Sequence, residues 1–339
     1  MINRNFAAPL LSICIPTYNR AKDFERMLQG VLPQLTNEVE IVVRDDGANL
    51  DTKVIFDRIL QRQEFNHQYI KEEKIGLDAS SIFLIEKAKG KFIWFFSDDD
   101  EMRPGAIARI LQLIKDHQDL TFMWANYDFE QLGNMAIIRD DGFFKDGNEV
   151  LETVGVAIGF LSAIIFKRES ALPALDHAKT HIVGFSFAFI VPILHILSSS
   201  GRFYFLRGPY ILCHPTSGEE FKKILNKNGG VKNNIAFKSY GIDFYNIINE
   251  FKDKFDDRVI RKVLAHNFGC LWRGILVGWV GGWDSPQGKR WNMFKIYWSF
   301  PECWIALVCF VMPLWVNKKL YKGYKLFFYQ RKLSYIPKK

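Results

Sequence analysis

The chain has 339 residues, of which 48% are hydrophobic, and a formal net charge of +8. It is longer than one average domain and has ample apolar content for a sizeable core, so we expect one main domain with an appendage. The five cysteines are odd in number and never spaced as CxxC, which argues against a disulfide framework or a zinc site and favours a reducing compartment. The N-terminus shows no secretory signal pattern, so we expect the protein to stay on the cytoplasmic side.

The positive charge is concentrated at one end of the chain. From Lys289 onwards there are eleven Lys and Arg and one acid, Glu302, so this tail carries +10 and the preceding 288 residues carry −2. A basic tail rich in aromatic residues is typical of contact with nucleic acid or with an anionic membrane surface.

The first third of the chain alternates short apolar runs with segments of helical periodicity. Strands are predicted at residues 10–17, 39–43, 67–71 and 92–96, and helices at residues 21–35, 52–63 and 78–88. This order predicts right-handed βαβ units. The strand ends near Thr17, Asp45 and Asp98 should then face one crevice, as in nucleotide-binding doubly wound sheets.

The stretch FIWFFSDDDEM, residues 92–102, carries the strongest chemical signal. Its strand is apolar on both faces, which indicates burial in a parallel sheet, with Asp98, Asp99 and Asp100 at its carboxyl end. Adjacent carboxylates repel one another and need a cation or hydration to stay ionised. Carboxylate oxygens suit Mg²⁺ or Mn²⁺ shared with substrate phosphates. A solvated acidic turn before the helix that starts near Pro104 is the alternative.

Glycine-rich phosphate loops are missing from the sequence. Neither GxGxxG after the first strand nor GxxxxGK[ST] anywhere is present. Nucleotide phosphates therefore need another partner, and a metal ion on the aspartates is the available one.

Three segments together resemble the hallmark segments of family-2 glycosyltransferases with the GT-A fold. They are IPTYNR at 15–20, EIVVRDDGANLDT at 40–52 and FIWFFSDDDEMRP at 92–104, within a match that covers residues 10 to 125. With GLD at 76–78 and an SDDD turn, the chain is most similar to bacterial O-antigen transferases of the abequosyltransferase-like group. The resemblance implies an α/β fold, a Rossmann-like mixed sheet flanked by helices, followed by a helical C-terminal region.

The resemblance also implies roles for particular residues. Asp45 would accept a hydrogen bond from the base ring of the nucleotide. Asp98, Asp99 and Asp100 would match the DxD motif that contacts the ribose and the metal bound to the diphosphate. Because an acid commonly stands where Ser97 stands, the choice of metal ligand is open, and Asp99 and Asp100 are favoured. The residues expected at the donor nucleotide are Pro16, Thr17, Tyr18, Arg20, Asp45, Asp78, Asp98 and Asp99.

Each of these assignments has a simpler alternative. Asp45 and Asp46 before Gly47 could form an ordinary turn. Tyr18 could only pack against its neighbours. Asp78 could cap the helix that follows it, and we slightly prefer this cap to a donor contact.

The acceptor half is expected at residues 126–230, after a donor half at 1–125. An inverting transferase needs a general base, which in the family is typically the second acid of an acidic pair on a helix downstream of the DxD. The matching segment here, residues 182–197, contains no acid, and its His195 is read as a core histidine. The catalytic base is therefore unassigned, and a mechanism without a conventional base stays open. The candidates are Asp176, His181, Asp128, Glu219 and Glu220.

His214 follows the last predicted core strand, residues 203–213. GT-A enzymes often place a late histidine or basic residue here, so His214 is a candidate ligand of the metal or partner of the diphosphate. A loop histidine without a role is the alternative. The segment 221–230 is a conjectural lid over the donor.

The C-terminal region, residues 231–339, is predicted to be helical, aromatic and basic. Its cleanest apolar run, residues 304–316, is too short to span a bilayer. Lysines and aromatic residues alternate after it, as in an interfacial helix on anionic lipid. A buried helical subdomain competes with this interpretation, whereas nucleic-acid binding leaves the apolar run without a role.

We therefore expect a metal-dependent glycosyltransferase (Mn²⁺ or Mg²⁺) that moves a sugar from a nucleoside diphosphate sugar to a saccharide acceptor. In line with the resemblance, the acceptor is expected to be polyprenyl-linked and the product part of a bacterial surface polysaccharide. The expected location is the cytoplasmic face of the inner membrane, as a peripheral protein. A sugar-phosphate nucleotidyltransferase, or a transferase-like binding or scaffold protein without catalysis, are the alternatives.

Overall fold

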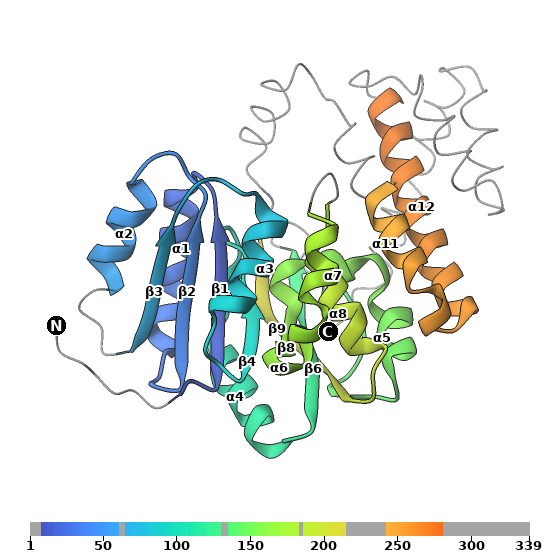
Figure 1. Cartoon of the computed structure of the whole chain (residues 1–339), viewed down its shortest axis with the longest axis horizontal. Helices are drawn as coiled ribbons and strands as arrows, with labels where there is room; N and C mark the ends of the chain where they lie inside the picture. The colour runs from blue at the N-terminus through green and yellow to red at the C-terminus, as the bar shows by residue number, and fades with distance from the viewer. Residues whose placement is uncertain (1–7, 61–64, 130–134, 183–185, 215–241, 281–339) are drawn as a thin grey trace, which may run out of the picture.

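The computed structural model describes residues 8–60, 65–129, 135–182, 186–214 and 242–280. Within them, one mixed nine-stranded sheet runs in the order β3-β2-β1-β4-β8-β6-β9-β5, with β7 paired to β9. Helices cover both faces of the sheet, and two further helices, α11 and α12, lie beyond its β6 and β9 end (Figure 1). The predicted mixed α/β sheet flanked by helices is confirmed.

The first half of the sheet is parallel and follows the predicted order. Strands β1 to β4 are all parallel, because the helix after each strand returns the chain to the same end of the sheet. Strand β1 lies between β2 and β4. The strands are β1 (Leu11–Thr17), β2 (Val39–Asp45), β3 (Asn66–Lys71) and β4 (Phe92–Phe95). The helices between them are α1 (Ala21–Val31), followed by the short 3-10 helix η1 (Leu32–Gln34), α2 (Asp51–Leu60) and α3 (Leu77–Lys87).

The second half departs from a purely parallel, doubly wound sheet. Strand β8 (Ile164–Lys167) is antiparallel to both β4 and β6 (Leu120–Phe129), between which it lies. Strand β9 (Arg202–Cys213) then runs parallel to β6. Sequence periodicity reports burial and not strand direction, so it could not distinguish this arrangement from an all-parallel sheet.

The segment that follows the aspartates pairs with a strand of the second half of the sheet. The two residues of β5 (Glu101–Met102) pair antiparallel with β9 before α4 (Ala106–Asp116) begins. This pairing folds the segment after β4 across the carboxyl edge, so Asp98–Asp100 lie between β4 and β9. The aspartates are therefore fixed by strand pairing at both ends.

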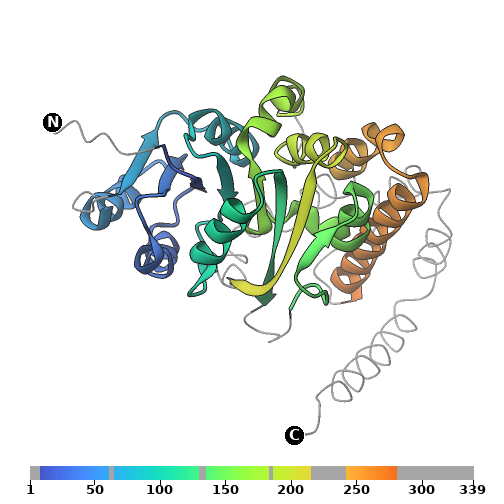
Figure 2. The same ribbon diagram turned by 90° about the horizontal axis from the view of Figure 1, so that it is seen from below.

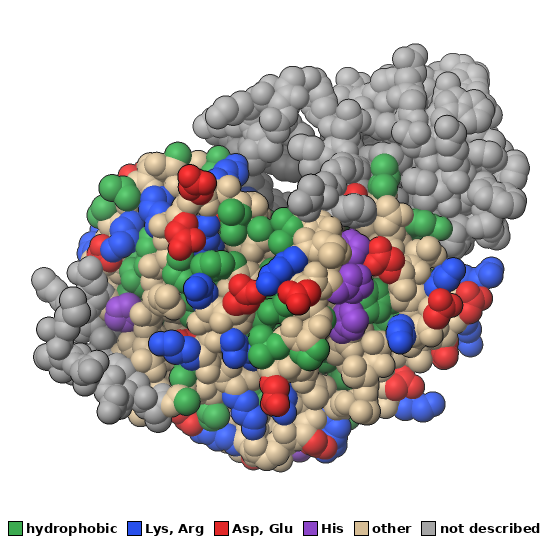
Figure 3. Space-filling model, viewed as in Figure 1, with side chains coloured by type: hydrophobic (Ala, Val, Ile, Leu, Met, Phe, Trp, Pro, Cys, Tyr) green, Lys and Arg blue, Asp and Glu red, His purple; other side chains and the backbone are tan. Residues whose placement is uncertain are grey.

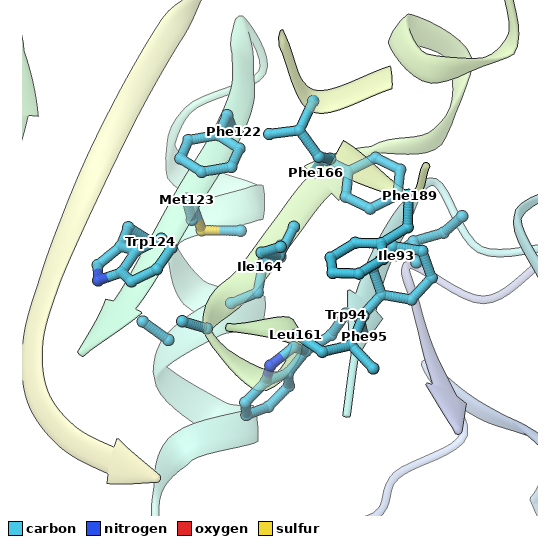
Figure 4. Packing of buried hydrophobic residues seen from close by; sticks show 14 of the residues in the cluster. Ile93, Trp94, Phe95, Phe122, Met123, Trp124, Leu161, Ile164, Phe166 and Phe189 are labelled. Atoms are coloured by element: carbon cyan, nitrogen blue, oxygen red, sulfur yellow. The ribbon is translucent and has the colours of Figure 1, made fainter. Parts of the chain in front are cut away.

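The core of the second half is aromatic. Phe95 of β4 packs against Phe166 of β8 and Phe189, with ring centroids 5.3 Å and 6.4 Å apart (Figure 4). The buried Trp94 indole donates a 2.7 Å hydrogen bond to the Ser162 carbonyl, which satisfies its only polar group. These contacts attach the second half of the sheet to β4.

The segment that leads into β8, residues 155–163, is mostly 3-10 helix. It is preceded by β7 (Gly142–Phe144) and α5 (Gly147–Val154). Between β8 and β9 the chain forms α6 (Arg168–Ala171), α7 (Leu175–Thr180) and α8 (Ile190–Leu197), the last shorter than the predicted helix. The remaining 3-10 helices are η2 (Gly155–Gly159), η3 (Leu161–Ala163), η4 (Leu172–Ala174) and η6 (Lys252–Lys254).

The described part of the C-terminal region is helical, as predicted, with α11 (Phe244–Glu250) and α12 (Asp257–Val280). Seen from below, they lie beside α5 and α8, at the end of the molecule opposite β3 and α2 (Figure 2). No helix among the described residues is long and apolar enough to cross a membrane. The predicted interfacial helix at residues 304–332 and the predicted lid at 221–230 lie outside the described residues.

Candidate donor site

Three strand ends meet at the carboxyl edge of the sheet, as predicted. Thr17 is paired with Asp45 in the register of β1 and β2, and its hydroxyl donates a 2.7 Å hydrogen bond to Asp98 Oδ2 beyond the end of β4. Thr17 and Asp98 are both buried. A hydrogen bond to a carboxylate is stronger than one between neutral groups, so this contact locks the β1 end to the aspartate turn.

A cavity of about 430 Å³ opens beside this contact. A volume of this order suits a small-molecule ligand. Of the eight residues predicted at the donor nucleotide, Pro16, Thr17, Tyr18, Arg20 and Asp98 line the cavity, and Asp45, Asp78 and Asp99 do not. Its other lining residues are Asp46, Lys74, Gly76, Leu77, Ser80, Ser97 and Leu161.

Arg20 holds two of the three aspartates together. Its Nη1 lies 3.1 Å from Asp98 Oδ1 and 2.7 Å from Asp99 Oδ2. Arg26 donates a 2.8 Å hydrogen bond to the backbone carbonyl of Asp99, and Ser97 Oγ donates to the carboxylate of Asp99. One guanidinium therefore balances part of the negative charge while remaining at the cavity wall.

Burial disfavours ionisation of two of the three carboxylates, those of Asp98 and Asp100. Desolvation raises the pKa of Asp98 to about 6, against the opposing effect of Arg20, and raises the pKa of Asp100 to about 7. Asp100 accepts a hydrogen bond from the Ser162 hydroxyl, and the charge on Asp99 raises its pKa further. A cation placed here would favour the charged forms of both carboxylates, so the chemistry of the cluster fits a divalent metal.

The predicted metal ligands Asp99, Asp100 and His214 come from neighbouring segments. Asp100 lies against Ser162 and the end of β9, and His214 Nε2 lies 3.2 Å from Glu101 Oε2. Across the part of the chain that the structure describes, these three side chains do not form a converging three-ligand group. A metal bound here would thus need further oxygens, which a substrate diphosphate provides.

The paired acids Asp45 and Asp46 have different positions. Both oxygens of Asp45 accept hydrogen bonds within the protein, Oδ1 from the Gly47 amide at 2.7 Å and Oδ2 from Tyr69 and from Lys71 at 2.9 Å. Asp46, in contrast, lines the cavity. The predicted base contact of Asp45 stays a prediction, and Asp46 is the acid of this pair that faces the cavity.

Asp46 also shapes the cavity wall. Its Oδ2 accepts from the Gly76 amide at 2.7 Å and from the Ile75 amide at 3.2 Å. Gly76 has φ +89°, a conformation that side chains rarely adopt, which explains a glycine at the start of α3. The GLD segment is thereby held against the end of β2.

Asp78 does not cap its own helix, because α3 begins at Leu77 with Gly76 as its N-cap and no side-chain cap. The carboxylate of Asp78 instead accepts from the backbone amide of Phe189 at 3.4 Å, before the first turn of α8. Burial raises the pKa of Asp78 to about 6, while these backbone contacts oppose the rise. The preferred cap assignment is therefore wrong, and Asp78 joins the donor half to α8.

The candidates for the general base are scattered. Asp176 is on the surface, with a side chain that is 99% exposed, and His181 belongs to a histidine cluster on α7. Asp128 pairs with Leu212 of β9, which pairs in turn with Glu101, next to Asp100. Glu219 and Glu220 lie outside the described residues. Asp128 is thus the described candidate that the sheet brings nearest to the aspartate turn.

Sequence reasoning missed several cavity residues. Lys74 lies over the Tyr18 ring, 3.8 Å from its centroid, and both side chains line the cavity. The Ser80 hydroxyl is buried and makes no hydrogen bond among the described residues. A buried hydroxyl without a hydrogen bond lowers the free energy of unfolding, because it has lost its bonds to water. Helical periodicity at residues 78–88 identified the inner face of this helix but could not show that its first turn borders a cavity.

Residues 12–171 match the family described as glycosyl transferase family 2. This part of the chain is a family-2 glycosyltransferase domain. The family match includes every residue that lines the cavity, so the candidate donor site lies wholly inside the matched domain.

Two of the relatives are named for a defined sugar transfer. The chain is 29% identical over 130 residues to the GalNAc(5)-diNAcBac-PP-undecaprenol beta-1,3-glucosyltransferase of Campylobacter jejuni, with 38% of this chain and 41% of that protein aligned. It is 23% identical over 274 residues to the abequosyltransferase RfbV of Salmonella typhimurium, with 75% of this chain and 80% of that protein aligned. The alignment with the first relative thus spans less than half of its length.

Two solved structures share the fold. The S. aureus TarS fragment 1-349 in complex with UDP-GlcNAc matches with a TM-score of 0.57 at 15% identity, covering 86% of this chain and 81% of that chain. The mannosyltransferase PcManGT of Pyrobaculum calidifontis, in complex with GDP-Man and Mn²⁺, matches with a TM-score of 0.50 at 13% identity, covering 97% and 83%. At 15% and 13% identity, these similarities show a shared fold and are not evidence for a shared activity.

Proposed function

We propose that this protein transfers a sugar from a nucleoside diphosphate sugar to a saccharide acceptor. The observation that carries the proposal is the Thr17–Asp98–Arg20 constellation beside a ligand-sized cavity, at the carboxyl edge where open α/β sheets bind ligands. The family match of the same residues, and the nucleotide sugars bound by the two proteins of similar fold, support it.

The cavity walls suit the parts of such a donor. Tyr18 is 46% exposed and offers the face of its ring that Lys74 does not cover, and Lys74 and Arg20 bring positive charge to the same cavity. The ring can stack on the nucleotide base, and the cations can pair with phosphate oxygens. Asp46 and Ser80 are then the polar groups placed to bind hydroxyl or amide groups of the donor.

We assign the metal to the Asp98–Asp100 turn, with Asp99 and Asp100 as ligands and His214 beside them. A divalent ion bound here supplies Lewis-acid stabilisation of the negative charge that grows on the leaving diphosphate. Arg20 keeps Asp98 and Asp99 together, and the Ser162 hydroxyl orients Asp100. Mn²⁺ in the structure of PcManGT supports a metal of this class.

For the acceptor we propose Asp128 as the group that takes the hydroxyl proton. Two strand spacings, about 10 Å, separate it from Glu101 across β9. Its Oδ1 is buried without a hydrogen bond in the described part of the chain, while Oδ2 lies 3.5 Å from Arg103. Asp128→Asn should lower kcat by at least about 100-fold, the usual contribution of a general base, with donor binding intact. Asp176→Asn is the matched control.

The acceptor class and location are proposed from the relatives. The Campylobacter jejuni relative is named for a polyprenyl-linked substrate, and the Salmonella typhimurium relative is named as an abequosyltransferase. We propose a polyprenyl-linked saccharide, a role in bacterial surface polysaccharide synthesis, and peripheral binding at the cytoplasmic face of the inner membrane. In the full chain, replacing Lys318, Lys319, Lys322 and Lys325 by Gln should reduce sedimentation with anionic vesicles; unchanged sedimentation contradicts the membrane proposal.

A donor screen tests the function directly. Thermal unfolding of the full chain is measured with UDP-, GDP- and CDP-sugars, with and without Mn²⁺, since a ligand of the native state raises the melting temperature. At least one donor should raise it in a metal-dependent way and be hydrolysed slowly, and Asp99→Asn should abolish the metal dependence. A donor that binds without any turnover favours the binding-protein alternative. No binding of any nucleotide sugar contradicts the proposal.

A further inference from the structure

A cluster of histidines lies on the face where α7, α8 and α11 meet, away from the donor cavity. Figure 3 shows histidine side chains gathered on this face beside acidic ones. His177 is on α7, His181 directly follows the helix, and His195 is on α8. Glu250 is the last residue of α11, 55 residues further along the chain than His195. The donor chemistry uses none of these four residues.

Three ligand atoms converge in this cluster. His177 Nε2 and His181 Nε2 are 3.3 Å apart, and Glu250 Oε2 lies 3.3 Å from the first and 3.1 Å from the second. For a tetrahedral ion with bonds of about 2.0–2.1 Å, neighbouring ligand atoms are about 3.3 Å apart. The three separations are therefore those of one face of such a tetrahedron.

The sequence spacing explains how the two imidazoles meet. Residues i and i+4 lie on the same face of a helical turn, so His177 and His181 project together from the end of α7. Among the described residues, His177, His181 and Glu250 are the three His, Cys, Asp or Glu side chains whose ligand atoms, one from each, all lie within 4.8 Å of one another. Glu250 completes it only because α11 packs beside α7.

His195 orients the first of these ligands. Its Nε2 lies 3.0 Å from His177 Nδ1, so the N–H of His177 Nδ1 can donate to it. This hydrogen bond leaves His177 Nε2 as the unprotonated nitrogen that faces His181 and Glu250. Metal-bound histidines commonly donate their other ring N–H to a neighbouring acceptor in this way. Phe251 packs on both rings, with centroids 6.0 Å from His177 and 5.0 Å from His195.

The exposure and the ligand types of the cluster also suit a bound metal ion. The side chains of His177 and Glu250 are 39% and 42% exposed, while that of His181 is 8% exposed, so the ligands form a shallow site that is open on one side. Two imidazoles and one carboxylate match the ligand preference of Zn²⁺ and similar transition metals, and differ from the all-oxygen sites that Mg²⁺ prefers.

We propose that His177, His181 and Glu250 bind one Zn²⁺-class transition-metal ion, with His195 as a positioning residue and one coordination position open to water. The ion links α7, in the segment between β8 and β9, to α11 near the C-terminal region, and so stabilises their packing. It is separate from the divalent ion assigned to Asp98–Asp100.

The test uses the full chain, stripped with a chelator and titrated with Co²⁺ and then Zn²⁺. A four-coordinate Co²⁺ site gives visible absorption, which one equivalent of Zn²⁺ should remove. Zn²⁺ should also raise the melting temperature, because it binds the native arrangement. Glu250→Gln, which keeps the side-chain shape, and His177→Asn should lose the absorption and the thermal shift. His195→Ala should weaken Zn²⁺ binding about 10–100-fold and retain the cobalt spectrum.

Two controls locate the ion. Asp176→Asn removes an exposed carboxylate that lies 3.5 Å from Lys179, and Asp99→Asn alters the donor aspartates; both should keep the cobalt absorption. Circular dichroism confirms that each variant is folded. The proposal is overturned if the wild-type chain gives no Zn²⁺-displaceable absorption, as expected for histidines that only form ion pairs with Glu250 when protonated. Retention of the absorption in folded Glu250→Gln, or its loss in Asp99→Asn, overturns it equally.

Discussion

The hydroxyl of Thr17 donates a 2.7 Å hydrogen bond to Asp98 Oδ2, joining residues that are 81 positions apart. Both lie at carboxyl ends of neighbouring parallel strands, so the contact exists only when β1 and β4 are in register. It fixes the aspartate turn relative to the cavity. The candidate donor site therefore depends on strand pairing as much as on the residues themselves.

Replacing Thr17 tests this contact. Thr17→Val keeps the shape and removes the donor, so the buried Asp98 carboxylate loses a hydrogen bond, at a cost of about 1.5–3 kcal/mol in the free energy of unfolding. Affinity for the nucleotide sugar should fall as well. Thr17→Ser keeps the hydroxyl and should stay near wild type. Urea unfolding and donor titration measure both effects, and equal behaviour of the two variants would show that the hydroxyl is unimportant.

Arg20 should matter more than a surface arginine. Arg20→Gln leaves Asp98 and Asp99 without their shared cation, and we expect a loss of about 2 kcal/mol, typical of charge-assisted hydrogen bonds. Arg58→Gln removes an exposed pair with Glu25 and should cost less than about 1 kcal/mol. Denaturant unfolding without added metal compares the two. A similar small loss in both variants contradicts the role assigned to Arg20.

Asp78 should make stability depend on pH. Because its pKa rises to about 6 in the folded state, folding takes up a proton in this range. Its contribution is fully present below pH ~4 and is lost as pH rises through about 6, up to roughly 3 kcal/mol for a shift of this size. Asp78→Asn should flatten that part of the profile and be relatively more stable at pH 7.5 than at pH 4.

The measurement is the free energy of unfolding of wild type and variant across that range. Asp176→Asn is the control, because its side chain is 99% exposed and should leave the profile unchanged. Parallel profiles for wild type and Asp78→Asn would mean that Asp78 titrates normally.

Gly147 allows the start of α5 to approach α8. A Cβ at this position would lie 1.9 Å from the carbonyl oxygen of Leu197, which is backbone and cannot rotate away. Gly147→Ala should therefore destabilise the protein by about 1–3 kcal/mol, as overpacking does. Gly142→Ala, where a Cβ meets nothing within 4 Å, is the nearby control and should change stability little. Thermal unfolding that ranks Gly142→Ala as equally damaging would contradict this explanation.

Local patterns predicted what depends on local chemistry. Apolar runs identified β1, β2, β4 and β9, since a buried strand must be apolar whichever strand it pairs with. The polar residues that follow three of these runs identified the carboxyl edge and five of the twelve residues that line the cavity: Pro16, Thr17, Tyr18, Arg20 and Asp98. The sequence by itself thus determined the parallel first half of the sheet, the helices between its strands and the edge at which the candidate donor site lies.

Tertiary structure decided which side chains face the cavity and which meet across the fold. Asp45 and Asp46 are neighbours in sequence, yet Tyr69 and Lys71 of β3 engage Asp45 while Asp46 lines the cavity. The direction of β8 and the packing of Glu250 against His177 likewise depend on long-range pairing, which a periodic pattern does not encode. A local pattern shows whether a residue is buried, and only the packing of distant segments sets what it is buried against.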